Sequence, residues 1–254
     1  MAELTHYQLL LIALIFVWSG FVRSGLGFGG SVLSLPFLLL VDNRPLIYLP
    51  IIALQLLFFS STIWLQNLWN ARNDPTQQTS VDWAYLKKAL GIMIVPKLIG
   101  VLGLLTIPAA LMGKIIFSIV GFYAISYIIN RPIQSRSKAF DIALLMLGAY
   151  VSGTSLIGAP LIMIVFAKHV ARHQLRDTLF VLWFILVCIK VGAFLLAKVD
   201  LQLAQQLWLL PCAAVGHVIG LRFHLYLLKA DQRIFFRVLG SVLLAISAIG
   251  LWRN

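Results

Sequence analysis

The chain has 254 residues, of which 61% are hydrophobic and only 11% are charged. A soluble domain has about 45–50% apolar and about 25% charged residues, so the composition excludes an ordinary soluble protein and indicates an integral membrane protein. A net charge of +12 would suggest a nucleic-acid partner in a soluble chain. Here most basic residues stand between apolar segments, as in cytoplasmic loops, and we expect a lipid bilayer and no nucleic acid.

The first apolar region, residues 7–41, contains an arginine and four glycines near its middle. It is too long for one straight helix of about 20 residues and too short for two full crossings of a bilayer core about 30 Å thick. We therefore predict two short helices joined by a break. Residues 139–167 also contain central glycines, and we predict a second broken pair there.

Each broken region is followed by three apolar runs that have the length of a membrane-spanning helix. These runs are residues 46–66, 85–105, 111–129, 175–197, 203–225 and 234–252.

The basic residues predict the topology. They concentrate in the loops at 67–84, 130–138 and 168–176 and around residues 222–237. These loops lie on one side of the membrane only if each broken region enters and leaves on the same side. By the positive-inside rule that side is cytoplasmic, and both termini are then external.

Under this topology the two halves of the chain, residues 1–130 and 131–254, enter the membrane from opposite sides. We therefore predict an all-α membrane protein with one membrane domain built from two inverted-topology repeats. Each repeat has a broken or re-entrant helix pair and three spanning helices. The similarity of GLGFGGSVLSLP at residues 25–36 to GTSLIGAPLIMI at residues 153–164 supports the repeat. Such repeats are typical of secondary transporters, which bind substrate near the membrane midplane.

The two breaks form the predicted substrate site. Irregular backbone at membrane depth occurs where it is buried in protein or lines a cavity, and the free N–H groups of a restarting helix suit an anion. The alternative is that the small residues only let helices pack closely. The predicted binding residues of the breaks are Gly27, Gly29, Gly30 and Ser31 in the first half and Ser152, Gly153, Thr154 and Ser155 in the second.

Arg23, Lys97 and Lys190 are basic residues inside predicted membrane segments. All acidic residues fall in loops or at segment ends, so we expect these cations to be unpaired and to favour an anionic ligand. Lys97 is the strongest candidate, because the neighbouring Pro96 frees a carbonyl and opens room. The alternative for Arg23 and Lys190 is snorkelling to the interface.

Two further polar residues complete the predicted site. His217 follows Pro211 much as Lys97 follows Pro96, with a hydrogen-bonded packing role as the alternative. Gln55 adds an amide in the first complete span, with bonding to its own helix as the alternative.

Motifs for other functions are missing from the sequence. It has no nucleophile with an adjacent base, no HExxH pattern and no GxxxxGK[ST] stretch. We therefore expect neither an enzyme nor an ATP-driven pump, and no metal or cofactor. A passive anion channel is the stronger rival to a carrier, because helix dipoles and basic side chains also build anion pores.

The glycine-rich stretch GLGFGGSVLSLPFLLL, the return early in the second half and the Pro/Gly pattern of residues 203–225 resemble the TauE/SafE family of sulfite exporter-like permeases. The resemblance covers nearly the whole chain. It implies secondary transport, with export as the expected direction, of sulfite, an organosulfonate or a related anion across the bacterial cytoplasmic (inner) membrane. The termini are then periplasmic. Uptake of another small organic anion is the alternative, and a homodimer is left open.

The resemblance also locates the motifs of the family in this chain. Its glycine stretch corresponds to Gly27, Gly29 and Gly30, and the counterpart in the second half to Gly153, Gly158 and Pro160. The sequence departs from the pattern at Ser31, where a third consecutive glycine is expected, and at Ala159, where a glycine is expected before the proline. These changes bear on the substrate more than on the fold.

Overall fold

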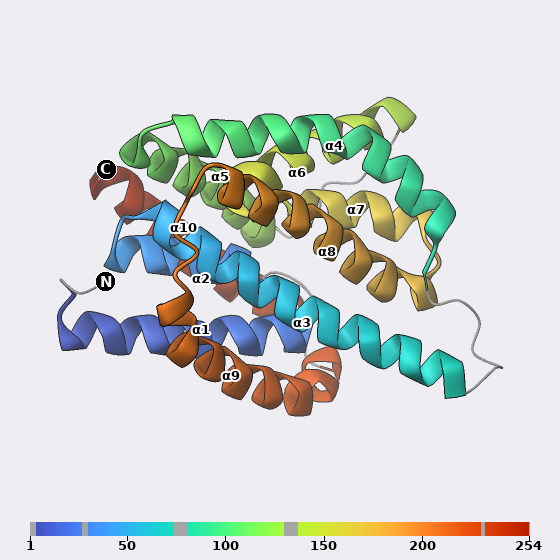
Figure 1. Cartoon of the computed structure of the whole chain (residues 1–254), viewed down its shortest axis with the longest axis horizontal. Helices are drawn as coiled ribbons and strands as arrows, with labels where there is room; N and C mark the ends of the chain where they lie inside the picture. Colours follow the sequence, from blue (N-terminus) through green and yellow to red (C-terminus); the bar gives the residue numbers. More distant parts are fainter. Residues whose placement is uncertain (1–3, 27–29, 74–80, 130–136, 230–231, 254) are drawn as a thin grey trace. The chain divides into compact units, whose positions relative to one another are not determined.

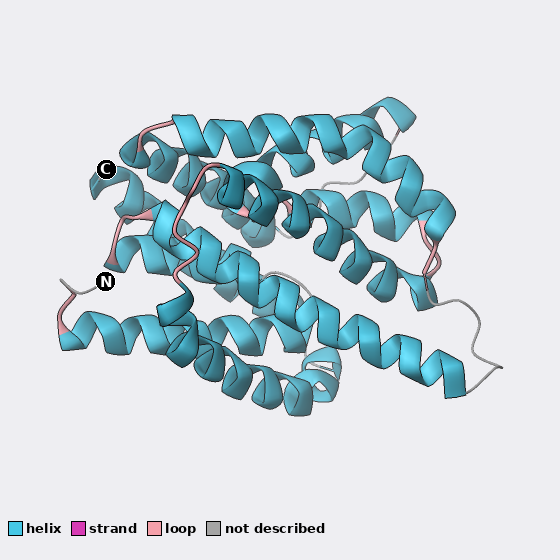
Figure 2. Cartoon of the chain, in the orientation of Figure 1, coloured by secondary structure: helices cyan, strands magenta, loops and turns pink. Residues whose placement is uncertain are grey.

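The computed structural model describes residues 4–26, 30–73, 81–129, 137–229 and 232–253. Every regular element in these ranges is a helix (Figure 2), so the all-α prediction is confirmed. In chain order the helices are α1 (His6–Leu26), α2 (Gly30–Val41), α3 (Pro45–Asn73), α4 (Trp83–Thr106), α5 (Ala109–Ile129), α6 (Lys138–Ser155), α7 (Ala159–His169), α8 (Arg172–Leu196), α9 (Leu203–Lys229) and α10 (Gln232–Arg253) (Figure 1).

Six helices of the described chain, α1, α3, α4, α5, α8 and α9, contain a stretch long and apolar enough to cross a membrane. The chain is therefore a multi-pass membrane protein. The sequence predicts five of these six spans. The sixth, α1, has 21 residues and is longer than the short helix predicted there, because no proline interrupts the chain between His6 and Leu26. Residues 234–252 are helical as predicted, within α10, which is not among the six.

Contacts divide the chain into two compact units, and each unit draws on both halves of the sequence. Unit 1 comprises Met1–Leu49, Ile107–Ile133 and Gln202–Asn254, and unit 2 comprises Pro50–Thr106 and Gln134–Leu201. The predicted repeats divide the chain by sequence, whereas the two units divide it by contacts. The units therefore do not test the repeat boundary near residue 130, which stays a prediction.

In unit 1, α1 packs along α9, and α5 packs along α10. The backbones of α1 and α9 approach closely at glycines. A Cβ atom built at Gly20 would lie 2.0 Å from the carbonyl oxygen of Ala213, and one at Gly216 would lie 1.8 Å from that of Val17. Glycine is therefore needed at both positions for this helix contact, as in other small-residue contacts between membrane helices.

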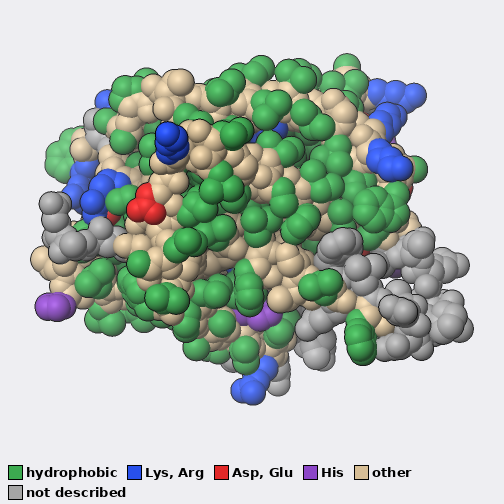
Figure 3. Space-filling model, in the orientation of Figure 1, with side chains coloured by type: hydrophobic (Ala, Val, Ile, Leu, Met, Phe, Trp, Pro, Cys, Tyr) green, Lys and Arg blue, Asp and Glu red, His purple; other side chains and the backbone are tan. Residues whose placement is uncertain are grey.

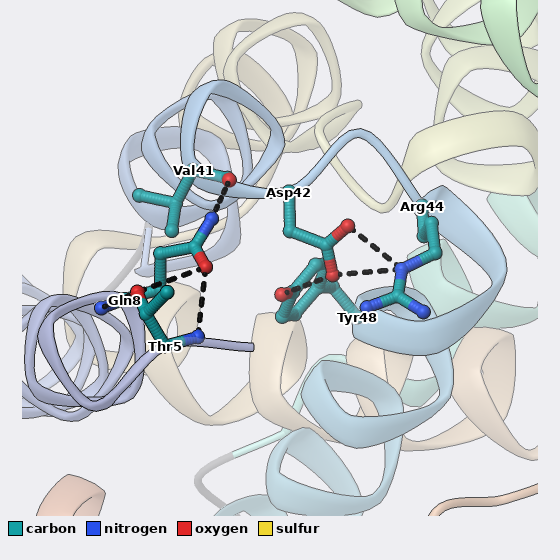
Figure 4. A network of polar contacts seen from close by, with 6 residues as sticks. All are labelled: Thr5, Gln8, Val41, Asp42, Arg44 and Tyr48. Carbon is teal, nitrogen blue, oxygen red and sulfur yellow. Dashed lines mark hydrogen bonds and ion pairs between the residues drawn. The ribbon is translucent and has the colours of Figure 1, made fainter. Parts of the chain in front are cut away.

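A polar network fixes the turn between α2 and α3 in unit 1 (Figure 4). The Asp42 carboxylate accepts hydrogen bonds from Arg44 Nε at 2.7 and 2.9 Å and from the Tyr48 hydroxyl at 2.8 Å. Beside it, Gln8 Nε2 of α1 donates to the Val41 carbonyl at 3.3 Å. These bonds hold the start of α1, the end of α2 and the start of α3 together.

In unit 2, α4 packs along α6, and α8 contacts α4 and α7 (Figure 1). The α4–α6 contact again depends on glycines. A Cβ atom at Gly100 would lie 2.3 Å from the Tyr150 carbonyl oxygen, and one at Gly153 would lie 2.5 Å from the Lys97 carbonyl oxygen. This close contact places Lys97 beside the last turn of α6.

The break between α6 and α7 is confirmed. Leu156 ends α6 in the left-handed region at φ 60°, and its N–H donates to the Ser152 carbonyl at 3.2 Å. A bulky residue rarely adopts this conformation, so the turn is strained. Gly158 precedes α7, and a Cβ atom there would lie 1.9 Å from the Gly148 carbonyl oxygen. The start of α7 is thus packed directly on the backbone of α6.

Candidate functional site

Two lysines meet the end of α6 in unit 2. Lys97 of α4 donates to the carbonyl oxygen and to Oγ of Ser152, both at 2.9 Å. Lys190 of α8 donates to the carbonyl oxygens of Gly153 at 2.7 Å and Thr154 at 3.2 Å. Both lysine side chains are fully buried, with 0% exposure. The structure therefore brings five of the predicted site residues into one cluster, which we call the lysine cluster.

The position of the lysine cluster follows from the break in α6. The carbonyls in the last turn of a helix lack intrahelical partners, and the helix dipole places about half a negative charge there. Because α6 stops at Ser155 inside the protein, these carbonyls need donors that are also buried. Lys97 and Lys190 supply them. The expectation that the two cations are unpaired was therefore wrong, because it considered carboxylates and not backbone carbonyls.

The helix end neutralises only part of the charge of the lysine cluster. Among the described residues of unit 2, Asp141 precedes Ser152 by eleven residues, about 17 Å along α6. Asp177 precedes Lys190 by thirteen residues, about 20 Å along α8. Asp82 precedes Lys97 by fifteen residues, about 22 Å along the helix axis, and Asp200 lies beyond the end of α8. When both lysines are protonated, two ammonium groups beside about half a negative charge leave a net positive charge, which favours an anion.

Each lysine of the cluster also retains hydrogen-bonding capacity. An ammonium group has three N–H donors, and the bonds above use two in each lysine. In the described part of the chain no acceptor takes the third. The Lys190 ammonium also lies 5.7 Å from the centroid of the Phe194 ring, which fixes the direction of its stem. Full burial of the ammonium excludes the snorkelling alternative for Lys190.

The small residues of this break have packing roles. The missing side chain of Gly153 leaves room for α4, since a Cβ atom would lie 2.9 Å from Gly100 Cα. The hydroxyls of Thr154 and Ser155 each donate to the Val151 carbonyl at 3.0 Å, within their own helix. Ser152 is the residue of this group whose side chain contacts a lysine. A role of the others in substrate binding stays a prediction.

The break in unit 1 contains another buried cation. Arg23 on α1 is buried, and a Cβ atom at Gly30 would lie 3.3 Å from its Nε. Ser19 Oγ and Ser34 Oγ donate to the Gly30 carbonyl at 3.3 and 2.6 Å, and the adjacent Ser31 is also buried. Arg23 and Gly30 therefore meet at the start of α2. The predicted site residues Gly27 and Gly29 lie outside the described residues.

His217 lies in the α1–α9 contact of unit 1, whereas the lysine cluster belongs to unit 2. Its Nδ1 bonds to Ser24 Oγ. Because the Ser24 hydroxyl already donates to the Gly20 carbonyl at 3.0 Å, His217 Nδ1–H is the donor. This contact supports the packing alternative for His217. Gln55 is fully buried in α3, and the lysine bonds described above do not include it.

Sequence reasoning missed the partners of the lysines. One available signal, for the contact of Lys190 with Phe194, was their four-residue spacing, which places both side chains on one helix face. A second was the Ser-Gly dipeptide, which occurs at residues 19–20, 24–25 and 152–153. Gly20 and Gly153 lie in close helix contacts.

Comparison with known proteins places the chain in a family. No curated protein and no solved structure matches it. A family model described as sulfite exporter TauE/SafE matches residues 11–251. Because this match covers nearly all of the 254 residues, the chain belongs to the sulfite exporter TauE/SafE family.

Proposed function

We propose that this protein is a secondary transporter that exports a small sulfur-containing anion, such as sulfite or an organosulfonate, across the bacterial inner membrane. Membership of the TauE/SafE family makes the chain a membrane transporter of the sulfite-exporter type. The observation that carries the proposal for the site is the pair of fully buried ammonium groups at the end of α6.

The substrate anion binds to the lysine cluster in this proposal. Its oxygens accept the remaining N–H of Lys97 and of Lys190, and Ser152 orients the Lys97 ammonium. Hydrogen bonds to charged groups contribute about 1.5–3 kcal/mol each, so two such bonds account for a substantial part of the affinity for a small anion. The sequence-based expectation that both helix breaks line one site near the midplane stays a prediction.

Export of an anion needs no coupling ion in this proposal. A membrane potential that is negative inside favours outward movement by about 2.3 kcal/mol per charge per 100 mV. The chemistry of the protein is then limited to binding and release, and the lysine cluster provides the binding step.

A binding screen tests the proposed substrate class. Thermal unfolding of the purified protein is measured with sulfite, sulfate, thiosulfate, taurine and sulfoacetate, and with carboxylates as controls. We expect at least one sulfur anion to raise the unfolding temperature more than any carboxylate. We expect Lys97→Met and Lys190→Met to reduce this shift strongly at the same ligand concentration, and Lys114→Met, which removes an exposed cation from α5, to keep it. Equal shifts with carboxylates would contradict the substrate class.

Counterflow in proteoliposomes distinguishes a carrier from a passive channel. In a carrier, unlabelled sulfite inside the vesicles accelerates the entry of labelled sulfite, because the loaded site returns faster than the empty one. We expect this acceleration. Entry that is independent of internal sulfite would identify a channel.

A further inference from the structure

Four helix ends of unit 2 are joined into one surface. The Asp82 backbone N–H donates to Thr178 Oγ1 at 2.9 Å, which links the starts of α4 and α8. Asp141 accepts from Lys168 Nζ at 3.0 Å and contacts His169 Nε2 at 2.8 Å, which links the start of α6 to the end of α7. The starts of α4, α6 and α8 and the end of α7 therefore face the same side of the unit.

An aromatic contact completes this junction. The Tyr85 ring of α4 stacks on His169 of α7, with 5.1 Å between centroids and 19° between planes. Tyr85 also meets the Phe166 ring edge to face at 5.1 Å. Side chains on this surface thus project from a fixed framework of four helices.

The surface is strongly basic. Its exposed cations, which we call the basic collar, are Lys87, Lys88, Lys138, Lys168, Arg172 and Arg176. Figure 3 shows a group of Lys and Arg side chains at the right-hand end of the view, where α4 and α6 begin. The Arg176 guanidinium lies 5.7 Å from the centroid of the Phe180 ring. Three helix N-termini add their positive dipole ends.

The acidic side chains described at these helix starts, Asp82, Asp141 and Asp177, offset half of the six positive charges of the basic collar. Asp141 is buried and already paired with Lys168 and His169. Asp82 accepts the Tyr85 backbone N–H at 2.9 Å and caps α4. Six cations and these three carboxylates leave a formal charge of +3 on the described surface, which is available to an outside partner.

Apolar side chains lie directly beside the basic collar. Trp83 and Phe140, in the first turns of α4 and α6, are 45% and 39% exposed, and Ile142 is 43% exposed. Both α4 and α8 are long and apolar enough to span a membrane from these turns onward. Exposed aromatic residues at the end of a span are typical of the headgroup level of a bilayer. Cations at that depth meet lipid phosphates before they meet a soluble polyanion.

We infer that the basic collar binds the phosphodiester headgroups of anionic phospholipids, with the exposed aromatic residues against the upper acyl chains. Lysine and arginine at this level are attracted to anionic leaflets. Both side chains bind phosphate, and arginine does so with two parallel hydrogen bonds. The basic collar lies at the ends of α6 and α7 that are remote from the break between these two helices. It is a site for lipid, separate from the lysine cluster.

Lipid retention tests this inference on the full chain. The protein is purified in detergent and mixed with equal amounts of an anionic phospholipid and a zwitterionic one, and the bound lipid is measured by native mass spectrometry. The test variant is Lys87→Gln, Lys88→Gln, Arg172→Gln and Arg176→Gln combined. Lys168 is kept because it pairs with buried Asp141. The control is Lys114→Gln with Lys198→Gln, which removes exposed cations elsewhere.

We expect selective retention of the anionic lipid by the protein and by the control, and about a tenfold or greater loss of apparent affinity in the test variant. Added salt should weaken binding in the protein as well. Equal retention of both lipids, or equal retention by the test variant and the control, would overturn the inference. So would competition by inorganic phosphate at equal concentration, which indicates a free-phosphate site, or by polyglutamate, which indicates an acidic protein partner.

Discussion

At the scale of single residues, the buried lysines show how one side chain serves both the fold and a site. Lys97 and Lys190 bond to carbonyls that α6 leaves open at its end, yet each keeps one N–H for a ligand within the described structure. The Ser152 carbonyl also accepts the Leu156 N–H. Loss of the Lys97 ammonium therefore does not leave this carbonyl without a donor.

The Lys97→Met variant tests the binding role. Methionine keeps much of the apolar bulk of the lysine stem and removes the charge. We expect the affinity for the preferred anion to fall about tenfold to a hundredfold, as for the loss of one charged hydrogen bond. We expect little loss of stability, because removal of a buried charge offsets the lost bonds. Transport in proteoliposomes and thermal unfolding of the purified protein measure the two effects.

Two matched variants control this result. Lys97→Arg should restore binding only in part, because a planar guanidinium does not fit the geometry of a compact ammonium. Lys114→Met removes an exposed lysine and should transport normally. Wild-type affinity and rate in Lys97→Met at matched expression would rule out a substrate role for Lys97.

The buried Asp141 carboxylate gives a second prediction at this scale. Asp141→Asn keeps the shape of the side chain and removes the charge that Lys168 and His169 contact. We expect the protein to lose about 1–3 kcal/mol of stability, measured by thermal unfolding. Lys168→Met should add little to the loss in the Asp141→Asn background, because the two residues interact. Fully additive effects would show that the pair is not coupled.

At the scale of helices, close backbone contact determines which elements pair. A Cβ atom at Gly216 would lie 1.8 Å from a backbone oxygen of α1, whereas nothing lies within 4 Å of one at Gly91. We expect Gly216→Ala to cost about 1–3 kcal/mol or more, because backbone atoms must move. Gly91→Ala should be neutral or stabilising by up to about 1 kcal/mol, because alanine favours helix.

Thermal unfolding in detergent compares these two variants directly. The substituted atom is the same in both, so the difference between them reports the helix contact and not a general effect of alanine. Equal unfolding temperatures for Gly216→Ala and Gly91→Ala would mean that the α1–α9 contact is looser than described.

The sequence predicts the helices better than it predicts their contacts. Bilayer thickness sets the length of a span, so runs of apolar residues locate the helices directly. The turn after Ser155 is also readable, because Gly158 and Pro160 follow it. The carbonyl partners of Lys97 cannot be predicted from the sequence. Every residue carries a carbonyl, and only the fold decides which carbonyls lack a helical donor. The glycines between residues 25 and 30 predicted the first break as well, and α1 ends at Leu26 and α2 begins at Gly30.

At the scale of the molecule, the two units pair corresponding helices. In unit 1 the first helix of one broken pair, α1, packs on α9, and in unit 2 the first helix of the other, α6, packs on α4. The Ser-Gly dipeptides at residues 19–20 and 152–153 lie in these two contacts. This correspondence supports the inverted repeats, which remain a proposal. A Ser-Gly dipeptide also occurs at residues 24–25, and the sequence comparison aligned that one with residues 152–153.

The predicted orientation in the membrane follows from charge and is tested on α8. This helix has 25 residues and extends about 37 Å, enough to cross the bilayer core of about 30 Å. Arg172 at its start and Lys198 just beyond its end are both exposed. The positive-inside rule places Arg172 in the cytoplasm, and Lys198 then lies outside.

Single cysteines at these positions make the orientation measurable. Cys188 and Cys212 are first replaced by alanine, and an impermeant maleimide is then added to intact cells. We expect it to label Lys198→Cys and Arg253→Cys, near the predicted external terminus, and to label Arg172→Cys only after the cells are permeabilised. Labelling of Arg172→Cys in intact cells would show that the orientation is opposite to the predicted one. Labelling of Arg253→Cys only after permeabilisation, with Lys198→Cys still external, would show that α9 and α10 do not both cross the membrane, contrary to the three spanning helices predicted for the second repeat.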